Sequence, residues 1–332
     1  MALIEVKNLK KEFKKPVRKE GVIGYIKSLF SRKYTSLYVV NDVSFSIDQG
    51  EIVGYIGANG AGKSTTVKMM CGILHPTSGS VTIDNKDILK YRKQINKEIG
   101  VVFGQKTQLW WDIPLIETFK ILKSIYEISD EDYNERFKFL SDLLDLNDFL
   151  DQNVRSLSLG QRMRADFAAS LIHNPKILYL DEPTIGLDVL VKDKIRKAIK
   201  ILNKKYKTTI ILTTHDMKDI EELCSRIIII DKGKILYDGN LENIKYKFGN
   251  IKTIIFKNNA KFNKDELINE FKKISIKEND SNDILISFSL NEVNLDNLLL
   301  SLINKYKVED FKINDISIED ITKELYENSK EN

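Results

Sequence analysis

Apolar residues recur along the chain with two different periods. Short continuous apolar runs, which are typical of buried strands, occupy residues 51–56, 176–180 and 208–213. Apolar residues three and four positions apart, which are typical of amphipathic helices, occupy residues 64–74, 114–150 and 189–206. Because segments of the two kinds alternate, the pattern predicts an α/β fold with a mostly parallel sheet.

The pattern changes near residues 241–250. Before this point, alternating segments at 4–9 and 39–47 predict two further strands, and residues 227–237 predict a hairpin turning at Lys232 and Gly233. Beyond it, the chain is richer in Asn, Lys and Ile, with expected strands at 253–257 and 284–289 and expected helices at 264–274 and 294–306. A length of 332 residues, at about 150 per domain, therefore suggests a main domain over residues 1–245 and a small α+β domain over 246–332.

Composition and charge exclude several classes of protein. Apolar residues make up 42% and charged residues 30% of the chain, which excludes collagen-like and low-complexity sequences. No apolar run approaches the roughly 18 residues of a membrane span, and the first residues lack the apolar core of a signal peptide, so we expect a cytosolic chain. The 52 basic and 48 acidic residues give a net charge of +4, too small to indicate a nucleic-acid partner.

A glycine-rich segment follows the strand expected at 51–56. Residues 57–64, Gly-Ala-Asn-Gly-Ala-Gly-Lys-Ser, match the pattern GxxxxGK[ST] and lie between a predicted strand and a predicted helix. Backbone N–H groups of such a loop wrap the β- and γ-phosphates of a nucleotide, the lysine adds a positive charge, and the serine can ligate magnesium. The residues expected to bind nucleotide here are Gly57, Asn59, Gly60, Gly62, Lys63, Ser64 and Thr65.

Two carboxylates end the apolar strand that begins at Ile177. Asp181 is placed to hold a phosphate-bound magnesium ion at the carboxyl edge of the sheet. Glu182, one residue further on, can polarise the water that attacks the γ-phosphate. Together with Lys63, the pair predicts a nucleotide-hydrolysing site.

Further motifs carry a family resemblance. They are Gln105 after an apolar strand, Leu157-Ser158-Leu159-Gly160-Gln161, Gly186-Leu187-Asp188, and His215 after residues 210–214. With the two motifs above, their order resembles that of the ATP-binding cassette (ABC) transporter ATPases over residues 3–241. The run Gln-Lys-Thr-Gln-Leu-Trp-Trp-Asp at 105–112 is similar, more narrowly, to ABC-2 type exporters, a group that includes viologen exporters.

The resemblance implies a P-loop NTPase fold with ATP and Mg²⁺ as cofactors. Its core would combine a mixed sheet with a helical subdomain at about residues 106–172, so that 1–245 is the ABC ATP-binding domain. Ser158, Gly160 and Gln161 would bind the γ-phosphate of an ATP held by a second subunit, and Asp188 would lie across that interface. His215 would contact the γ-phosphate and orient water, with Gln105 touching magnesium and that water. Leu159 departs from the family, where glycine is usual.

Three regions leave alternatives open. Tyr34 has the spacing expected of the aromatic residue that stacks on adenine, with Tyr38 and Phe13 as other candidates. Residues 14–33 form a basic insertion that would contact the membrane or the permease as an amphipathic helix, or form a solvated loop. Trp110 and Trp111 would dock a membrane subunit or only pack within the chain.

We expect, from this resemblance, an ATPase that powers an ABC-2 type exporter. Its partners would be integral membrane permease subunits and a second ATPase subunit, as a homodimer, at the cytoplasmic face of the cell membrane. Two alternatives are a soluble ABC ATPase without a transport role and an importer ATPase with a regulatory tail.

Overall fold

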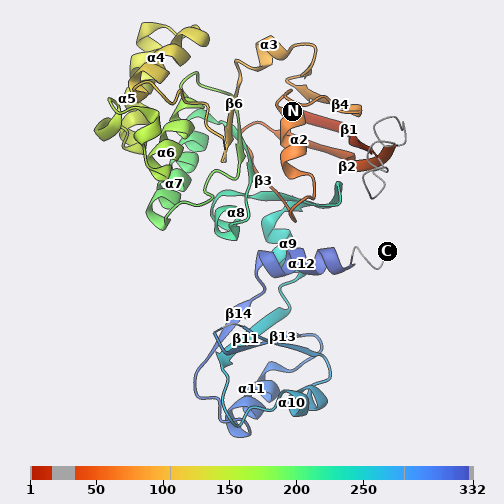
Figure 1. Ribbon diagram of the computed structural model, residues 1–332. Coiled ribbons are helices and arrows are strands. Elements are labelled where there is room, and N and C mark those ends of the chain that lie inside the picture. The colour runs from red at the N-terminus through yellow and green to blue at the C-terminus, as the bar shows by residue number, and fades with distance from the viewer. Residues whose placement is uncertain (1, 17–33, 105, 280, 329–332) are drawn as a thin grey trace, which may run out of the picture. The chain divides into compact units, whose positions relative to one another are not determined.

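The computed structural model describes residues 2–16, 34–104, 106–279 and 281–328. The chain divides into two compact units, Met1–Gly239 and Asn240–Asn332 (Figure 1). A division at residue 245, as drawn from the sequence, falls inside α9 (Leu241–Lys247) of the second unit. Within the described ranges, no helix is both long enough and apolar enough to cross a membrane.

A six-stranded sheet, in the order β10-β9-β3-β8-β7-β6, forms the centre of the first unit. The strands are β3 (Ile52–Gly57), β6 (Ile99–Phe103), β7 (Ile177–Asp181), β8 (Thr209–Thr213), β9 (Arg226–Asp231) and β10 (Lys234–Asn240). From β9 to β6, neighbouring strands are parallel, and β3, β7 and β8 are nearly continuous apolar runs because both faces are covered. Parallel strands end at a common edge of the sheet, where ligands bind, so Gly57, Asp181 and Thr213 end at that edge.

A second, four-stranded sheet covers one side of this core. Its order is β2-β1-β4-β5, with β1 (Ala2–Pro16), β2 (Tyr34–Asp48), β4 (Ser78–Ile83) and β5 (Lys86–Asp87). The strands β1 and β2 pair from Ala2 and Asp48 to Pro16 and Tyr34, so they are longer than the alternating segments predicted. Residues 17–33 of the basic insertion lie outside the described residues, and the hypotheses about them stay predictions.

One apolar core joins the two sheets through helix α2 (Lys63–Met70). Val67, Met69 and Met70 of α2 are buried together with residues of β1, β2, β3 and β7. Burial of this kind stabilises a fold by about 25 cal/mol for each Å² of apolar surface removed from water. It also fixes the start of α2 against the carboxyl end of β3.

The remaining helices of the first unit are α3 (Arg92–Ile95), α4 (Leu115–Ile125), α5 (Asp130–Leu144), α6 (Leu159–Ala169), α7 (Val189–Tyr206) and α8 (Met217–Leu223). The helical prediction for 114–150 and 189–206 is confirmed. Helix α5 begins after Ser129, whose hydroxyl accepts the N–H of Asp132, and Glu127 with a positive φ separates it from α4. Figure 1 shows α4 to α7 gathered on one side of the parallel strands, and α2 with β1, β2 and β4 on the other.

The second unit has the order strand, helix, strand, strand, helix, strand. These elements are β11 (Ile251–Lys257), α10 (Lys264–Glu270), β12 (Ile274–Glu278), β13 (Asp283–Ser289), α11 (Leu295–Asn304) and β14 (Phe311–Asp315), followed by α12 (Ile318–Asn328). The sheet order β12-β13-β11-β14, antiparallel throughout, is that of a ferredoxin-like βαββαβ domain. Its core packs Ile254, Phe256 and Ile286 of the sheet with Leu267 and Leu298 of the helices.

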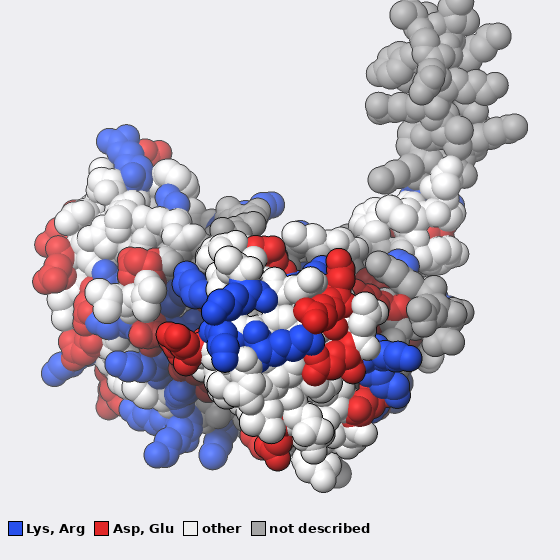
Figure 2. Space-filling view, turned by 90° about the horizontal axis from the view of Figure 1, so that it is seen from below, with Lys and Arg blue, Asp and Glu red and all other residues white. Residues whose placement is uncertain are grey.

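The surface of the molecule carries charges of both signs. In Figure 2, the visible face shows basic and acidic side chains next to one another, separated by uncharged areas. The second unit also contains an open cavity of about 710 Å³, whose lining includes Lys257, Lys307, Asp283 and Glu309. No motif singled out in the sequence lies in that cavity.

Candidate active site

The loop between β3 and α2 is built around glycines with positive φ. Gly60 and Gly62 have φ values of +83° and +107°. A Cβ atom at Gly62 would lie 2.5 Å from the carbonyl oxygen of Val39, so position 62 accepts only glycine unless β2 moves. No described side chain caps the first turn of α2, so its backbone N–H groups are available to an anion.

The Lys63 side chain folds back into this loop. Its Nζ donates to the carbonyl oxygens of Gly57 at 2.7 Å and Ala58 at 3.2 Å. Burial lowers the pKa of the Lys63 ammonium group, and the carboxylates of Glu182 and Asp181 act in the opposite direction. The structure therefore holds a cation inside the loop, with Asn59 and Gly60 exposed at its rim and Ser64 and Thr65 half-buried on α2.

Ser64 and Asp181 meet at the carboxyl edge of the sheet. The Ser64 hydroxyl donates to Oδ1 of Asp181 at 3.1 Å, and the Thr213 hydroxyl donates to the same oxygen at 2.6 Å. A hydroxyl and a carboxylate are hard oxygen ligands of the kind Mg²⁺ prefers, together with substrate phosphates. Ser64 and Asp181 thus fit a magnesium ion beside the phosphate-binding loop.

Glu182 and His215 form a contact next to this pair. Oε1 of Glu182 lies 2.8 Å from Nε2 of His215. Glu182 has a φ of +56°, which is rare for a residue with a side chain, and its N–H donates to the Thr213 carbonyl at 2.9 Å. A Cβ at Gly104 would lie 2.1 Å from the Glu182 carbonyl oxygen, so glycine is required there as well. Both side chains line a cavity of about 350 Å³.

The segment from Ser158 to Gln161 lies away from the phosphate-binding loop within one chain. It begins α6 with reciprocal caps: Gln161 N–H donates to Ser158 Oγ at 3.2 Å, and Ser158 N–H donates to Gln161 Oε1 at 2.9 Å. Figure 1 places α6 and α2 on opposite sides of β3. Gly160 lies in the same first turn of α6. Asp188 caps the next helix, α7, where its carboxylate accepts the N–H of Val191 at 3.0 Å.

Two predicted site residues lack a described side chain. Gln105 lies outside the described residues, and Tyr34 is described only as the backbone that starts β2 and pairs with Pro16. The other adenine candidates, Tyr38 and Phe13, are exposed on β2 and β1. All three remain open for adenine stacking.

The tryptophan pair lies on the surface of the first unit. Trp110 and Trp111 are 40% and 49% exposed, and the guanidinium of Arg162 on α6 lies 5.3 Å from the ring centre of Trp111. Trp111 therefore packs on α6 while about half of its surface faces solvent.

Threonines at the sheet edge were missed by the sequence analysis. The Thr213 hydroxyl donates a hydrogen bond to Asp181. Thr184, two residues after Glu182, and Thr214, directly before His215, are both buried. Polar residues at the end of an apolar strand were the available signal for Thr213 and Thr214. Nothing in the local pattern marks Thr184.

The geometry agrees with comparisons to known proteins. The ABC transporter family profile matches residues 40–185, which include the phosphate-binding loop, Asp181 and Glu182. The chain is 34% identical to the ABC transporter ATP-binding protein NatA of Bacillus subtilis (strain 168) over 215 residues, 65% of this chain and 87% of NatA. It is 35% identical to the energy-coupling factor transporter ATP-binding protein EcfA2 of Clostridium tetani over 205 residues, 60% of this chain and 71% of EcfA2.

A third relative is longer than this chain. The probable multidrug ABC transporter ATP-binding protein YbhF of Escherichia coli K12 is 33% identical over 220 residues, which are 66% of this chain and 38% of YbhF. The match therefore spans well under half of that protein.

Solved structures share the fold of the first unit. A dimeric, post-hydrolysis structure of the ATP-binding cassette MJ0796 with ADP and Pi has a TM-score of 0.60 and 28% identity, covering 72% of this chain and 98% of that chain. CbiO1 of Clostridium perfringens, part of the transporter complex CbiONQ, has a TM-score of 0.59 and 25% identity, covering 75% of this chain and 94% of that chain.

Proposed function

The chain belongs to the ABC transporter family, and on that premise we propose that it powers an ABC-2 type exporter whose permease subunits are separate polypeptides. It is an ATP-binding subunit with ATPase activity, converting ATP and water to ADP and phosphate. The predicted P-loop NTPase fold of an ABC ATPase is confirmed. The export direction, the partners and the role of each residue belong to the proposal.

The contact between Glu182 and His215 carries the part of the proposal that concerns ATP hydrolysis. These side chains meet at 2.8 Å beside the Asp181 carboxylate that Ser64 contacts. A carboxylate that can take a proton, a second group that can orient water, and a phosphate cradle are the parts needed for hydrolysis of a phosphoanhydride.

Each residue has one role in this scheme. The backbone N–H groups of residues 57–63 and the Lys63 ammonium bind the β- and γ-phosphates. Glu182 accepts a proton from the water that attacks the γ-phosphorus, and His215 holds that water and the γ-phosphate in line. The residues do little covalent chemistry, because catalysis of phosphoryl transfer depends on positioning and electrostatics.

Ser64 and Asp181 would hold Mg²⁺, and Gln105, outside the described residues, would complete the set. When bound, Mg²⁺ neutralises charge on the phosphate oxygens. Thr213 donates to Asp181 at 2.6 Å, which fixes the orientation of the carboxylate.

The active unit is proposed to be a homodimer. Ser158, Gly160, Gln161 and Asp188 would complete the ATP site of a second copy, since α6 and α2 lie on opposite sides of one chain. The positive end of the α6 dipole, at the turn that Ser158 and Gln161 cap, would then face an anion. The dimeric MJ0796 structure supports this arrangement, and two copies of this chain supply every half-site twice.

Export is favoured by the run at 105–112, which resembles ABC-2 type exporters, and by similarity to the multidrug protein YbhF. Similarity to EcfA2 and CbiO1 supports the alternative that the chain is an importer ATPase. In the exporter reading, the chain associates with permease subunits at the cytoplasmic face of the membrane, and the exposed Trp110 and Trp111 are the docking site.

The test uses Glu182→Gln expressed together with the membrane proteins encoded beside it. Binding without hydrolysis should trap a closed dimer, so ATP should give a dimer that copurifies with a membrane protein in detergent. Lys63→Ala is the control, since it should prevent nucleotide binding and give no ATP-dependent dimer. A dimer without any membrane partner would favour the soluble ATPase, and transport that requires an external solute-binding protein would favour the importer.

A further inference from the structure

We propose that the buried ion pair between Arg196 and Asp219 positions the two catalytic loops, so that Glu182 and His215 keep their contact. The pair touches neither ATP nor the reacting atoms. Arg196 and Asp219 are therefore positioning residues, and this inference rests on the roles proposed above for Glu182 and His215.

The ion pair is almost completely buried. Arg196, on α7, is 2% exposed and Asp219, on α8, is fully buried. The Arg196 Nε donates to Oδ1 of Asp219 at 2.6 Å. Desolvation makes such a pair weak evidence for stability, because apolar residues of similar volume often serve as well. A role in fixing one geometry is a better explanation for two charges inside the protein.

The second carboxylate oxygen of Asp219 reaches both catalytic loops. Oδ2 accepts the Thr184 hydroxyl at 2.6 Å and the Thr214 hydroxyl at 3.1 Å. Thr184 is two residues after Glu182, and Thr214 immediately precedes His215. One carboxylate thus joins the chain that leaves β7 to the chain that leaves β8.

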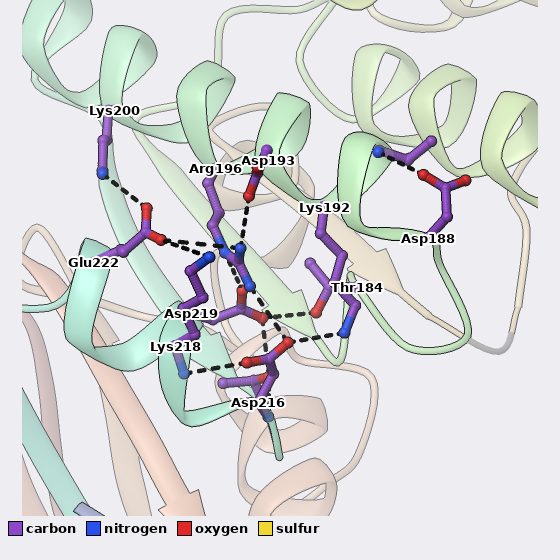
Figure 3. A network of polar contacts seen from close by, with 12 residues as sticks. Thr184, Asp188, Lys192, Asp193, Arg196, Lys200, Asp216, Lys218, Asp219 and Glu222 are labelled. Carbon is purple, nitrogen blue, oxygen red and sulfur yellow. Dashed lines mark hydrogen bonds and ion pairs between the residues drawn. The ribbon is translucent and has the colours of Figure 1, made fainter. Parts of the chain in front are cut away.

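A second carboxylate extends the network at the surface. Oδ2 of Asp216, the residue after His215, accepts from Lys192 Nζ at 2.8 Å and from Arg196 at 3.3 Å. Burial would raise the pKa of Asp216, but the Lys192 hydrogen bond and the charges of Lys192 and Arg196 outweigh it and lower that pKa. Figure 3 shows Arg196 pointing between Asp193, Asp216 and Asp219, with Lys192 approaching Asp216 from the same helix.

These contacts hold α7 against the turn that carries His215. Helix α7 begins at Val189, directly after its N-cap Asp188, so the helix backbone runs from that cap to the network. Within these two loops, Glu182 and His215 are the residues proposed to act on the reacting atoms, and their relative position depends on groups one and two residues away. A misplacement of about 1 Å in a catalytic group can lower a rate by about 100-fold.

The test removes one anchor without unpairing a charge. Arg196→Met alone would leave the Asp219 carboxylate buried and unpaired, which is strongly destabilising and would mix a loss of stability with a loss of positioning. Thr184→Val keeps the shape and the ion pair and removes only the hydroxyl, whereas Thr184→Ser keeps the hydroxyl. Lys200→Met is the matched control. Lys200 lies on α7 with Arg196, and its partner Glu222 touches the network only through a 3.9 Å contact with Arg196, away from the Asp219 bonds to Thr184 and Thr214.

Two readouts are made on the full chain with its membrane partner. We expect Thr184→Val to lower kcat by on the order of 10- to 100-fold, with a change of less than about twofold in the affinity for a fluorescent ATP analogue. Thr184→Ser and Lys200→Met should stay within about twofold of the unmodified protein. Equal kcat values for Thr184→Val and Thr184→Ser would overturn the proposal, as would a loss confined to ATP affinity.

A spectroscopic measurement separates this inference from the proposed function. The chain has three histidines, so the ring resonances of His215 can be assigned by comparison with His215→Gln. Thr184→Val should shift the His215 resonance, whereas Lys200→Met should not, even if Glu182→Gln proves not to affect hydrolysis. An unmoved His215 resonance overturns the positioning role whether or not the catalytic assignment holds.

Discussion

Replacing Asp166 by Asn is expected to stabilise the folded chain at neutral pH. Asp166 lies on α6 with 3% of its surface exposed, and it accepts the N–H of Gln108 at 3.0 Å. Burial raises the pKa of Asp166 from 3.8 to about 6, against the opposing effects of Thr107, Gln108 and Arg162. The folded protein therefore holds a carboxylate that would ionise more easily in the unfolded chain.

The size of the effect follows from the two pKa values. The full contribution of Asp166 to the free energy of unfolding is present below pH 4 and is lost as the pH rises through about 6. The reason is that the Asp166 carboxyl group releases its proton at lower pH in the unfolded chain than in the folded chain. A shift of about 2 pH units corresponds to about 3 kcal/mol of unfolding free energy. Asn stays neutral, and its Oδ1 can still accept the Gln108 N–H. The unfolding free energy of the variant should therefore not fall as the pH rises through about 6.

Urea unfolding at pH 4.5, 6 and 8 measures this difference. Tryptophan fluorescence reports on the first unit, since both tryptophans of the chain, Trp110 and Trp111, lie in it. The stability of Asp166→Asn minus that of the unmodified chain should rise by about 2 to 3 kcal/mol between pH 4.5 and pH 8. The exposed Asp151→Asn is the control. A pH-independent difference, or an Asn variant less stable at pH 8, would refute the reasoning.

Two further predictions concern His173 and Gly62. His173 lies with Nε2 2.9 Å from the Ile99 carbonyl oxygen and stacks on Tyr126, and burial lowers its pKa to about 4. The neutral His173 ring stabilises the folded chain above pH 6.5, and this stabilisation is lost as the pH falls through about 4. In the same unfolding assay, the loss of unfolding free energy at acid pH should therefore be smaller by about 3 kcal/mol in His173→Gln. An equal loss in the variant and the unmodified chain would contradict this. Gly62→Ala should weaken binding of a fluorescent ATP analogue by at least about tenfold, since a left-handed φ costs about 1 to 2 kcal/mol for a residue with a Cβ and the Val39 carbonyl must also move. Unchanged affinity would show that the loop relaxes freely.

The geometry of the loop at residues 57–64 could be predicted because the residues that form the turn and the residue expected to bind phosphate lie in one short segment. Residues 57–64 contain both the glycines that allow the turn and the lysine that uses it. Asp181 and Glu182 could also be predicted from a short segment, because the end of an apolar strand marks their place at the edge of the sheet. The assignments of Ser158 and Asp188 came from the resemblance, and one chain cannot bring them to the loop they are expected to serve.

The positioning network could not be predicted from local patterns. The sequence pattern does not separate Arg196 from the other charged residues of α7, such as the exposed Lys197 and Lys200. Asp219 lies on a short helix that the sequence analysis did not predict. Only the packing of α7 against α8 shows that both are buried. In the second unit, β14 was missed because four of its five residues are exposed and it has only two apolar residues, Phe311 and Ile313.

The β1–β2 pairing makes the basic insertion a natural grafting position. Pro16 and Tyr34 are direct cross-strand partners, so the ends of the inserted segment are held at the spacing of a hairpin whatever lies between them. Because loop-closure entropy rises by only about 0.6 kcal/mol for each doubling of loop length, residues 17–33 can be exchanged for a short turn, an affinity tag or a reporter peptide while the strand register below is retained. A chimaera of that kind would deliver a label to this end of the first unit while the sequence of the loop at residues 57–64 and of Asp181 and Glu182 stays unchanged.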